Sequence, residues 1–452
     1  MYTKALAEFV INTPTKQIPA AVLDGSRHAI VDTLGCALAG SLEPIAHILN
    51  DWIADLGARP QASVWGSSLK TSPAEAAFAN GTLSHALDFD DSLPSLHGHP
   101  SATIAPAALA VAEVVGASGA DTLAAYALGL EVAGAIGRAI GPGHYVRGWH
   151  NTATVGTFAA TAAAARLWKL NTEQLQIAWG LAASQMSGLV QNFGTMTKPF
   201  HAGHAARSGV LAAWMAHKGF TANPQIFDGA SSIFSTYGTG DGQDLGSLIP
   251  SLGNPWQITA PGIYVKRWPC CYCNHRPVGG LLQLINKHNI QPDEVTAIEI
   301  GFVRGSDDAL ISTNPQTGLE GKFSIEYVAA ATVLDRKLVL NTFTDAMVQR
   351  PAIRQLMSKT RRYRVDDPNF YTSKTGYTDI AITTTRGHFP MRVTEVSGSP
   401  QWPMTEEERQ EKFMGCASLA LGEQASATLL HELQRFATLP SLTTLVTAPI
   451  TR

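Results

Sequence analysis

Apolar residues at helical spacing dominate the first half of the chain. Small and branched apolar side chains recur at intervals of three and four residues over 20–38, which predicts an amphipathic helix. Further helices are predicted at 104–116, 122–140, 155–168, 172–189 and 205–219. Asn171 is placed as an N-cap, and Gly219 as a helix terminator. The many alanines give these helices small faces, which favours a compact bundle of crossing helices over a long coiled coil.

The pattern changes after residue 266. Alternating positions predict a strand at 295–303 and a hairpin made of 378–385 and 389–396. Helices are predicted around these strands at 277–289, 324–335, 345–358, 406–419 and 422–436. The order of elements predicts a mostly α protein, with a large all-helical bundle domain and a smaller inserted α+β domain. The helical domain is expected to be discontinuous, 1–266 plus 400–452, and the α+β domain to cover 267–399.

Composition limits the classes of function. A chain of 452 residues is too long for one hydrophobic core, which predicts two domains. The net charge of −3 gives no basic surface for nucleic acid or for a membrane. The five cysteines lack the even spacing of a secreted disulfide protein, and the N-terminus lacks a signal pattern, so a reduced, cytoplasmic protein is expected. Glu131 and Arg138 interrupt the apolar stretch 122–140, which suits a buried helix better than a membrane span.

The segment 81–106 concentrates groups that could carry chemistry. It holds His85, His97, His99, Asp88, Asp90 and Asp91 in a chain with only 15% charged residues. Acids on an alanine-rich background lose solvation when buried, so they normally lie where a neighbouring charge or a ligand compensates them. One wall of an active site is therefore predicted here. The alternative that Asp90 and Asp91 only cap the next turn stays open.

Three further clusters carry proton-transfer groups or cations. They are GWHNTAT with His150, KPFHAGH with Lys198 and His201, and KRWPCCYCNH with Lys266, Arg267 and Cys271. Lysine and arginine are suited to binding carboxylates, and histidine and tyrosine to moving protons. Each cluster also has a structural alternative: His150 as a packing or capping residue, Lys198 as a solvated lysine, and the cysteines as inert buried thiols. The histidines and cysteines match no zinc spacing.

These clusters, in this order, resemble the MmgE/PrpD family, which includes 2-methylcitrate dehydratases, cis-aconitate decarboxylases and an iminodisuccinate epimerase. The matching stretches, between about residues 80 and 413, are HALDFDD with HPS, GWHNTATVG, MTKPFHAGHAARSG, VKRWPCCYCNH, KFSIEY and WPMTEEERQEKF. The resemblance implies a helical domain built from both ends of the chain, a smaller α+β domain and a homodimer. It also implies a small polycarboxylate substrate, and a pocket between the domains that needs no cofactor. No metal is expected, because the histidines and cysteines lack zinc spacing.

The residues that match the family's pocket are Asp88, His99, His150, Lys198, Lys266 and Tyr327, with Ser92 where many members have threonine. The chain departs from the decarboxylase pattern in two ways. One extra residue between Asp88 and His99 leaves His97 and His99 competing for one role. Cys271 stands where the decarboxylases carry a histidine, which disfavours decarboxylation.

The common chemistry of the family is a carbanion-like state beside a carboxylate, which fixed cations stabilise. Lys198, Lys266 and Arg267 are the predicted cations, and Ser92, His97 and His201 complete the substrate-binding set. His99 and His150 form the leading proton-transfer pair, with Asp88 orienting a histidine. Tyr145, Tyr327 and Cys271 are held in reserve as catalytic groups.

The leading functional prediction is an epimerase of the iminodisuccinate type, or a closely related 2-methylcitrate-type dehydratase. The alternatives are a cis-aconitate-type decarboxylase, a non-catalytic polycarboxylate-binding protein and a metal-dependent hydrolase.

Overall fold

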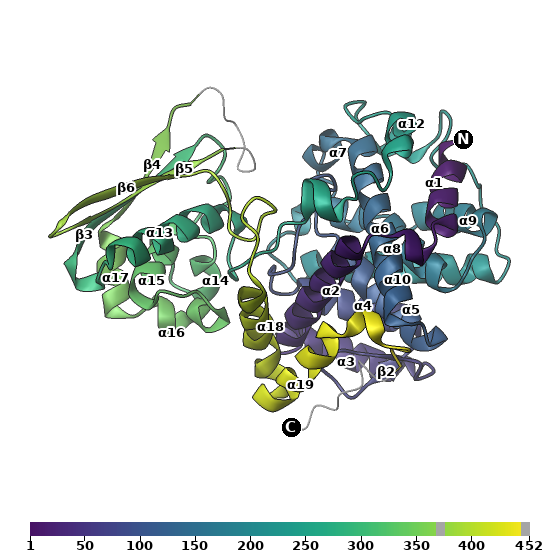
Figure 1. The fold of residues 1–452 in the computed structure, drawn as a ribbon, viewed down its shortest axis with the longest axis horizontal. Helices are drawn as coiled ribbons and strands as arrows, with labels where there is room; N and C mark the ends of the chain where they lie inside the picture. The colour runs from purple at the N-terminus through teal and green to yellow at the C-terminus, as the bar shows by residue number, and fades with distance from the viewer. Residues whose placement is uncertain (368–375, 444–452) are drawn as a thin grey trace. The chain divides into compact units, whose positions relative to one another are not determined.

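The computed structural model describes residues 1–367 and 376–443, and the chain divides into two compact units (Figure 1). The first unit comprises Met1–Tyr264 together with the C-terminal part from Glu406, and the second comprises Val265–Thr405. The sequence placed the boundaries at 266 and 400. Residues 368–375 and 444–452 of the two predicted domains fall outside the described part of the chain.

The first unit is built almost entirely of helices. They are α1 (Tyr2–Asn12), α2 (Ala20–Gly40), α3 (Pro44–Leu56), α4 (Pro73–His85), α5 (Ser101–Val115), α6 (Gly119–Ile140), α7 (Pro142–Val146), α8 (Asn151–Leu167), α9 (Thr172–Ala183), α10 (Thr197–His217), α11 (Ile233–Tyr237), α12 (Leu245–Leu248), α18 (Glu406–Leu421) and α19 (Glu423–Gln434). The strands β1 (Ala62–Ser63) and β2 (Lys70–Thr71) form a short antiparallel pair. The prediction of a mostly α protein is confirmed.

Small residues allow the helices of the first unit to cross closely. A Cβ atom added to Gly81 of α4 would lie 2.9 Å from the Cα of Gly203 in α10. Only glycine fits at such a crossing, because a larger side chain would push the two backbones apart. The close approach brings the C-terminal end of α4 and the first turns of α10 into one region.

Helix α6 lies within the core of this unit. It is long and apolar enough to cross a membrane, but 94% of its most apolar window is buried inside the protein. Burial among neighbouring helices is typical of the core helix of a large domain.

The C-terminal helices return to the start of the chain, and α18 packs against α2 (Figure 1). Lys412 of α18 forms a buried ion pair with Asp32 of α2 at 2.7 Å, and Phe413 is buried beside it. Both ends of the chain therefore build the first unit.

The second unit combines helices with one sheet. Its helices are α13 (His275–His288), α14 (Gly318–Gly321), α15 (Ile325–Asp335), α16 (Asp345–Val348) and α17 (Pro351–Ser358), and its strands are β3 (Val295–Val303), β4 (Thr360–Val365), β5 (Thr378–Thr384) and β6 (Gly387–Val393). The strand order is β4-β3-β5-β6, with β3 parallel to β4 and antiparallel to β5. Ile298 and Ile300 pair with Ile382 and Ile380, and α13, α15 and α17 cover this apolar face (Figure 1).

Three predicted elements differ in detail. The helix expected at 345–358 is divided into α16 and α17, because Pro351 disfavours a helical conformation of Arg350, which has ψ 132°. The helix expected at 172–189 ends at Ala183. Strand β4, with the sequence TRRYRV, was not predicted, because its arginines hide the alternation of an edge strand.

Candidate active site

Four segments of the first unit meet at the predicted cluster of acids and histidines. His85 is the last residue of α4, and the loop 86–100 connects it to α5. His150 is the N-cap of α8, and Lys198 lies in the first turn of α10. The crossing of α4 and α10 at Gly81 and Gly203 is what brings these ends together.

The loop 86–100 is fixed against the start of α8. The side chain of Asn151 donates to the carbonyl of Leu96 at 2.9 Å, and the amide of His99 donates to Oγ1 of Thr152 at 3.0 Å. A Cβ atom on Gly98 would lie 2.8 Å from the same Oγ1, so the loop can approach the helix only because this residue is glycine. His99 is therefore held by its backbone.

The structure separates the two histidines that compete in the sequence. His97 lies in a turn with φ 54°, where its amide donates to the carbonyl of Pro94. His99 instead lies beside two carboxylates, with Nε2 3.8 Å from Asp88 and Nδ1 3.2 Å from Asp90. His99 is thus the histidine that the fold brings to the acids.

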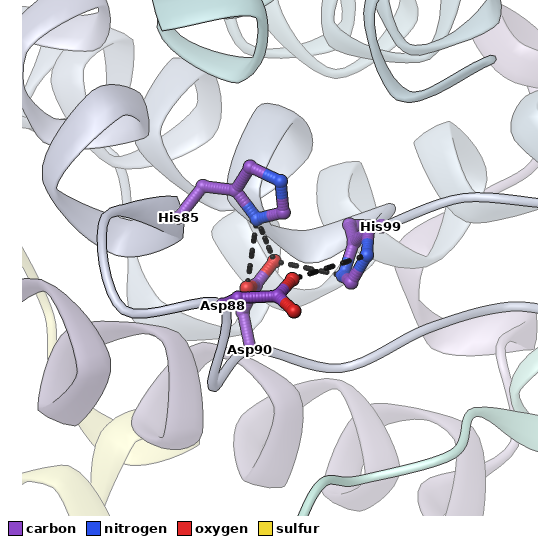
Figure 2. A group of neighbouring side chains, drawn as sticks. All are labelled: His85, Asp88, Asp90 and His99. Carbon is purple, nitrogen blue, oxygen red and sulfur yellow. Dashed lines mark hydrogen bonds and ion pairs between the residues drawn. The ribbon is translucent and has the colours of Figure 1, made fainter. Parts of the chain in front are cut away.

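Figure 2 shows Asp90 between the imidazoles of His85 and His99. Nδ1 of His85 lies 2.8 and 3.0 Å from the two carboxylate oxygens of Asp90, and both side chains are fully buried. His85 and Asp90 were not in the predicted set of site residues. The signal that could have found them is their spacing across the end of α4, which lets a histidine in the last helical turn meet an acid in the following loop.

Lys198 joins this cluster through Asp88. Its ammonium group donates to Oδ1 of Asp88 at 2.6 Å and lies 5.2 Å from the ring centre of Phe193. Lys198 is therefore a partly buried, paired cation and not a solvated loop lysine. Asp88 itself has φ 53°, a left-handed conformation that is costly for residues other than glycine and is often found at functional sites.

His150 and His201 form a second pair of imidazoles beside the first. Their Nδ1 atoms lie 3.1 Å apart, and the rings of His150 and His85 are stacked with their centres 6.1 Å apart. Two ring nitrogens at this distance share a hydrogen bond only if one of them carries no proton. Asp88, His99, Lys198, His150 and His201 are thus brought together in the first unit.

Burial keeps most of these histidines neutral. Burial lowers the pKa of His85 to about 4. Burial, followed by the neighbouring His85 and Lys198, lowers the pKa of His150 well below its usual value. Burial and the neighbouring His204 also lower the pKa of His201. These imidazoles therefore carry an unprotonated ring nitrogen at neutral pH, which is the form in which an imidazole accepts a proton.

The pKa values of the adjacent acids Asp90 and Asp91 are shifted in opposite directions. Burial alone would raise the pKa of Asp90, but His85 and His99 outweigh it and lower the pKa well below its usual value, so Asp90 is ionised. Burial raises the pKa of Asp91 to about 8. Oδ2 of Asp91 accepts from the hydroxyl of Ser101 at 2.5 Å at the start of α5. Oδ1 of Asp91 also accepts from the main-chain amide of Ser101 at 3.4 Å. The capping alternative therefore applies to Asp91, whereas Asp90 pairs with imidazoles.

Two predicted residues lie at the edge of this cluster. Tyr145 of α7 is 38% exposed, and burial, followed by the charge of Asp88, raises its pKa. Ser92 exchanges two main-chain hydrogen bonds with Tyr264, at 2.9 and 2.8 Å. Ser92 therefore has a structural role through its backbone.

The other predicted residues belong to the second unit. Lys266 and Cys271 are buried, and Arg267 donates to the hydroxyl of Ser397 at 3.0 Å. Tyr327 is fully buried, and its hydroxyl donates to the carbonyl of Thr342, which gives it a structural role within that unit. The membership of Lys266, Arg267, Cys271 and Tyr327 in one pocket with Asp88 stays a prediction.

Four side chains of the site have atoms that could bind a metal ion. One donor atom each from His85, Asp88, Asp90 and His99 lies within 4.8 Å of the others, and these nitrogen and oxygen types suit zinc. However, Asp90 already accepts from His85, and Asp88 already accepts from Lys198. A metal ion would have to displace both donors, so we assign these contacts as hydrogen bonds.

The first unit is helical and contains a cluster of acids, a lysine and neutral histidines, and the second unit combines helices with a sheet. Both features agree with the family suggested by the sequence motifs. The chain belongs to the MmgE/PrpD family: residues 4–245 match its N-terminal domain and residues 268–435 its C-terminal domain.

Two cis-aconitate decarboxylases are similar over most of the chain, and a third relative is similar over a shorter part. It is 27% identical over 470 residues to a cis-aconitate decarboxylase of Homo sapiens, covering 99% of this chain and 95% of the relative. It is 26% identical over 379 residues to a cis-aconitate decarboxylase of Aspergillus terreus, covering 79% and 77%. A probable 2-methylcitrate dehydratase of Saccharomyces cerevisiae is 34% identical over 100 residues, 22% of this chain and 19% of the relative.

Proposed function

We propose that the protein is a lyase that acts on a small polycarboxylate through a carbanion-like state beside a carboxylate. The observation that carries this proposal is the Lys198–Asp88 pair, which lies within a group of buried, mostly neutral imidazoles. This arrangement offers one fixed cation and several proton acceptors in a setting largely removed from water.

The lysine and the histidines have complementary tasks in such a reaction. The ammonium of Lys198 binds a substrate carboxylate and stabilises the negative charge that grows on it in the transition state. His99, with Nε2 facing Asp88, and His150 exchange the proton with the substrate. Asp88 holds both Lys198 and His99, so it fixes the distance between the cation and the base.

Among the outcomes of this chemistry we propose decarboxylation of a cis-aconitate-type substrate. The bond to the departing carboxylate breaks, carbon dioxide leaves, and the remaining electron pair on the substrate takes a proton that an imidazole of the site has gained from solvent. Similarity to cis-aconitate decarboxylases over 99% of the chain supports this outcome over the epimerase expected from the sequence.

A second candidate is a dehydratase of the 2-methylcitrate type or the iminodisuccinate epimerase. The observation that favours it is Cys271, which stands where the decarboxylase pattern has a histidine and is buried in the second unit. In these reactions the same carbanion-like state expels a hydroxide from the neighbouring carbon, or is protonated on the opposite face.

Three substrates in deuterated water separate these outcomes. The purified protein is incubated with cis-aconitate, 2-methylcitrate and iminodisuccinate. Release of carbon dioxide from cis-aconitate supports the main proposal. New alkene absorbance from 2-methylcitrate means dehydration, and deuterium at the α-carbon of iminodisuccinate means epimerisation. Binding of all three without turnover would make the protein a non-catalytic binder and overturn the proposal.

Replacement of Lys198 tests the role of the cation. We expect Lys198→Met to lower kcat/KM by about 100-fold or more, because one oriented charge removed from a developing anion typically costs this much. The matched control is Lys218→Met at the end of the same helix, where the lysine is exposed and lies over Trp214. Equal activity of both variants would show that Lys198 does not touch the reacting substrate.

The homodimer and the cytoplasmic location implied by the sequence are kept as parts of this proposal. Sedimentation equilibrium is expected to give about twice the chain mass of 48.1 kDa.

A further inference from the structure

Asp90 is enclosed by two imidazoles: that of His99, which the sequence motifs identify as a site residue, and that of His85, which they do not distinguish from a packing residue. Its carboxylate lies 2.8 and 3.0 Å from Nδ1 of His85 and 3.2 Å from Nδ1 of His99 (Figure 2). The side chains of His85 and Asp90 are completely shielded from solvent, whereas that of His99 retains 15% exposure. Of the two imidazoles, only His99 can therefore reach a substrate from the solvent side.

These contacts determine where the ring protons are. An ionised carboxylate only accepts hydrogen bonds, so the nitrogen that faces it must carry the proton. Nδ1 of His99 also donates to the carbonyl of Asp91 at 2.8 Å, which leaves that nitrogen with two acceptors. Nε2 of neutral His99 is consequently the atom with the free lone pair, since it lies 3.8 Å from Asp88, beyond hydrogen-bonding distance.

We propose that His85 and Asp90 are positioning residues: His85 fixes the carboxylate of Asp90, and Asp90 fixes the ring and the tautomer of His99. This inference rests on the proposed function, in which Nε2 of His99 exchanges a proton with the substrate. Without the donor from His85, the carboxylate of Asp90 is free to rotate away from His99. Nδ1 of His99 then keeps only the carbonyl of Asp91 as an acceptor. With this weaker preference, Nε2 carries the proton in part of the molecules and cannot act as a base in them.

A packing role alone does not explain His85. Its Nε2 is buried and has no hydrogen-bond partner within residues 1–367 and 376–443. A buried polar atom in this state costs stability, and so does the ionised carboxylate beside it. A leucine in this place would avoid the first cost. The histidine is accounted for by its Nδ1–H, the group that holds Asp90.

Two substitutions of His85 show whether its Nδ1–H donor or the imidazole ring itself is required. Asparagine places its side-chain N–H near the position of Nδ1, so His85→Asn keeps the donor, whereas His85→Leu removes it. We expect His85→Leu to lower kcat by about 10- to 100-fold, the size typical of orienting partners, with KM changed by less than about threefold. We expect His85→Asn to recover most of the loss. Thr82→Val is the matched control, since it removes another buried polar group from α4 without touching Asp90.

The tautomer of His99 is a direct readout that needs no substrate. In protein labelled with ¹⁵N-histidine, the ring nitrogen shifts report which nitrogen carries the proton, and His99→Gln assigns the signal. We expect Nδ1 protonated and Nε2 unprotonated in the unmutated protein and in His85→Asn, and a mixture of tautomers in His85→Leu. Should His85→Leu fail to fold, Asp90→Asn replaces it, because its amide cannot accept from both imidazoles as a carboxylate does.

The outcomes distinguish this inference from the proposed function. An unchanged His99 tautomer and unchanged kcat in His85→Leu would overturn the positioning role. Equal loss of activity in His85→Asn and His85→Leu would also overturn it, since the ring itself would then be needed. Failure of the unmutated protein to turn over any tested polycarboxylate would instead defeat the proposed function, while the nitrogen spectrum would still decide on the role of His85.

Discussion

Charges alternate along the site at the scale of single residues. The cation Lys198 contacts the anion Asp88, which faces His99, and His99 and His85 enclose the anion Asp90. A substrate carboxylate that binds Lys198 competes with Asp88 for the same ammonium. Asp88 reaches both the lysine and the histidine from a left-handed backbone conformation, φ 53°.

The raised pKa of Asp91 predicts that the free energy of unfolding depends on pH. Burial raises its pKa to about 8, from about 3.9 in an unfolded chain. Between these values the folded protein holds a proton that the unfolded chain has lost. The contribution of Asp91 to the free energy of unfolding is therefore complete below about pH 4 and is lost as pH rises towards 8, by at most about 1.4 kcal/mol per pH unit. Asp91→Asn imitates the neutral acid and should abolish this contribution.

The measurement is the difference in the free energy of unfolding between the unmutated protein and Asp91→Asn, from urea titrations at pH 5 and pH 8. Other titrating groups, such as the buried histidines, cancel in the difference. We expect Asp91→Asn to gain stability relative to the unmutated protein as pH increases. A constant difference across this range would mean that Asp91 is ionised in the folded protein.

The sequence pointed to some site residues and missed others for a physical reason. Asp88, His150 and Lys198 stand out because charged groups are rare on their alanine-rich background. His85 and Asp90 are equally unusual in the sequence, but their roles depend on which atoms face each other across the end of α4. A single sequence contains no distance, so it cannot distinguish an acid that caps a helix, as Asp91 does, from one that holds two imidazoles.

At the scale of elements, α18 supports the loop that carries the acids. Lys412 donates to the carbonyl of Phe89 at 2.9 Å and pairs with Asp32 of α2 at 2.7 Å. We expect Lys412→Met to lower the free energy of unfolding by about 3–5 kcal/mol, because it leaves Asp32 as an unpaired buried charge. Chemical denaturation at neutral pH measures the change.

A double variant shows whether the charge is the cause. Asp32→Asn combined with Lys412→Met removes both charges, and it should be clearly more stable than Lys412→Met alone. Lys4→Met is the control, since it breaks an exposed ion pair with Glu8 and should change stability by less than about 1 kcal/mol. A double variant no more stable than Lys412→Met would trace the loss to packing around Phe89.

The sequence predicted elements well where one pattern dominates the local conformation. The strand at 295–303 and the hairpin around Arg386 were found from alternation, which the pairing of β3, β5 and β6 confirms. The helix at 345–358 was too long because apolar periodicity continues through Pro351, although the backbone cannot. Strand β4 depends on its neighbour β3 for hydrogen bonds, and its own residues give no alternating signal.

At the scale of the whole molecule, the first unit is closed by its last segment. Helix α18 follows the second unit in the chain and packs against α2, and the buried thiol of Cys416 lies in hydrogen-bonding contact with Cys36 of α2. Contacts between residues so distant in sequence form late, because the entropy of closing the intervening chain must be overcome first. The first unit is therefore incomplete until α18 has docked.

Truncation tests this dependence on the chain's end. A chain ending at Thr405 lacks Lys412, Phe413 and Cys416, so it leaves Asp32 unpaired and a buried face of α2 exposed to water. We expect this chain to accumulate as insoluble protein, or to unfold without a cooperative transition.

A chain ending at Thr443 keeps every contact described for α18 and α19 and should unfold cooperatively near the midpoint of the full chain. Thermal denaturation followed by circular dichroism compares the two. A soluble, cooperatively unfolding chain ending at Thr405 would show that the helices before Tyr264 form a stable core without α18.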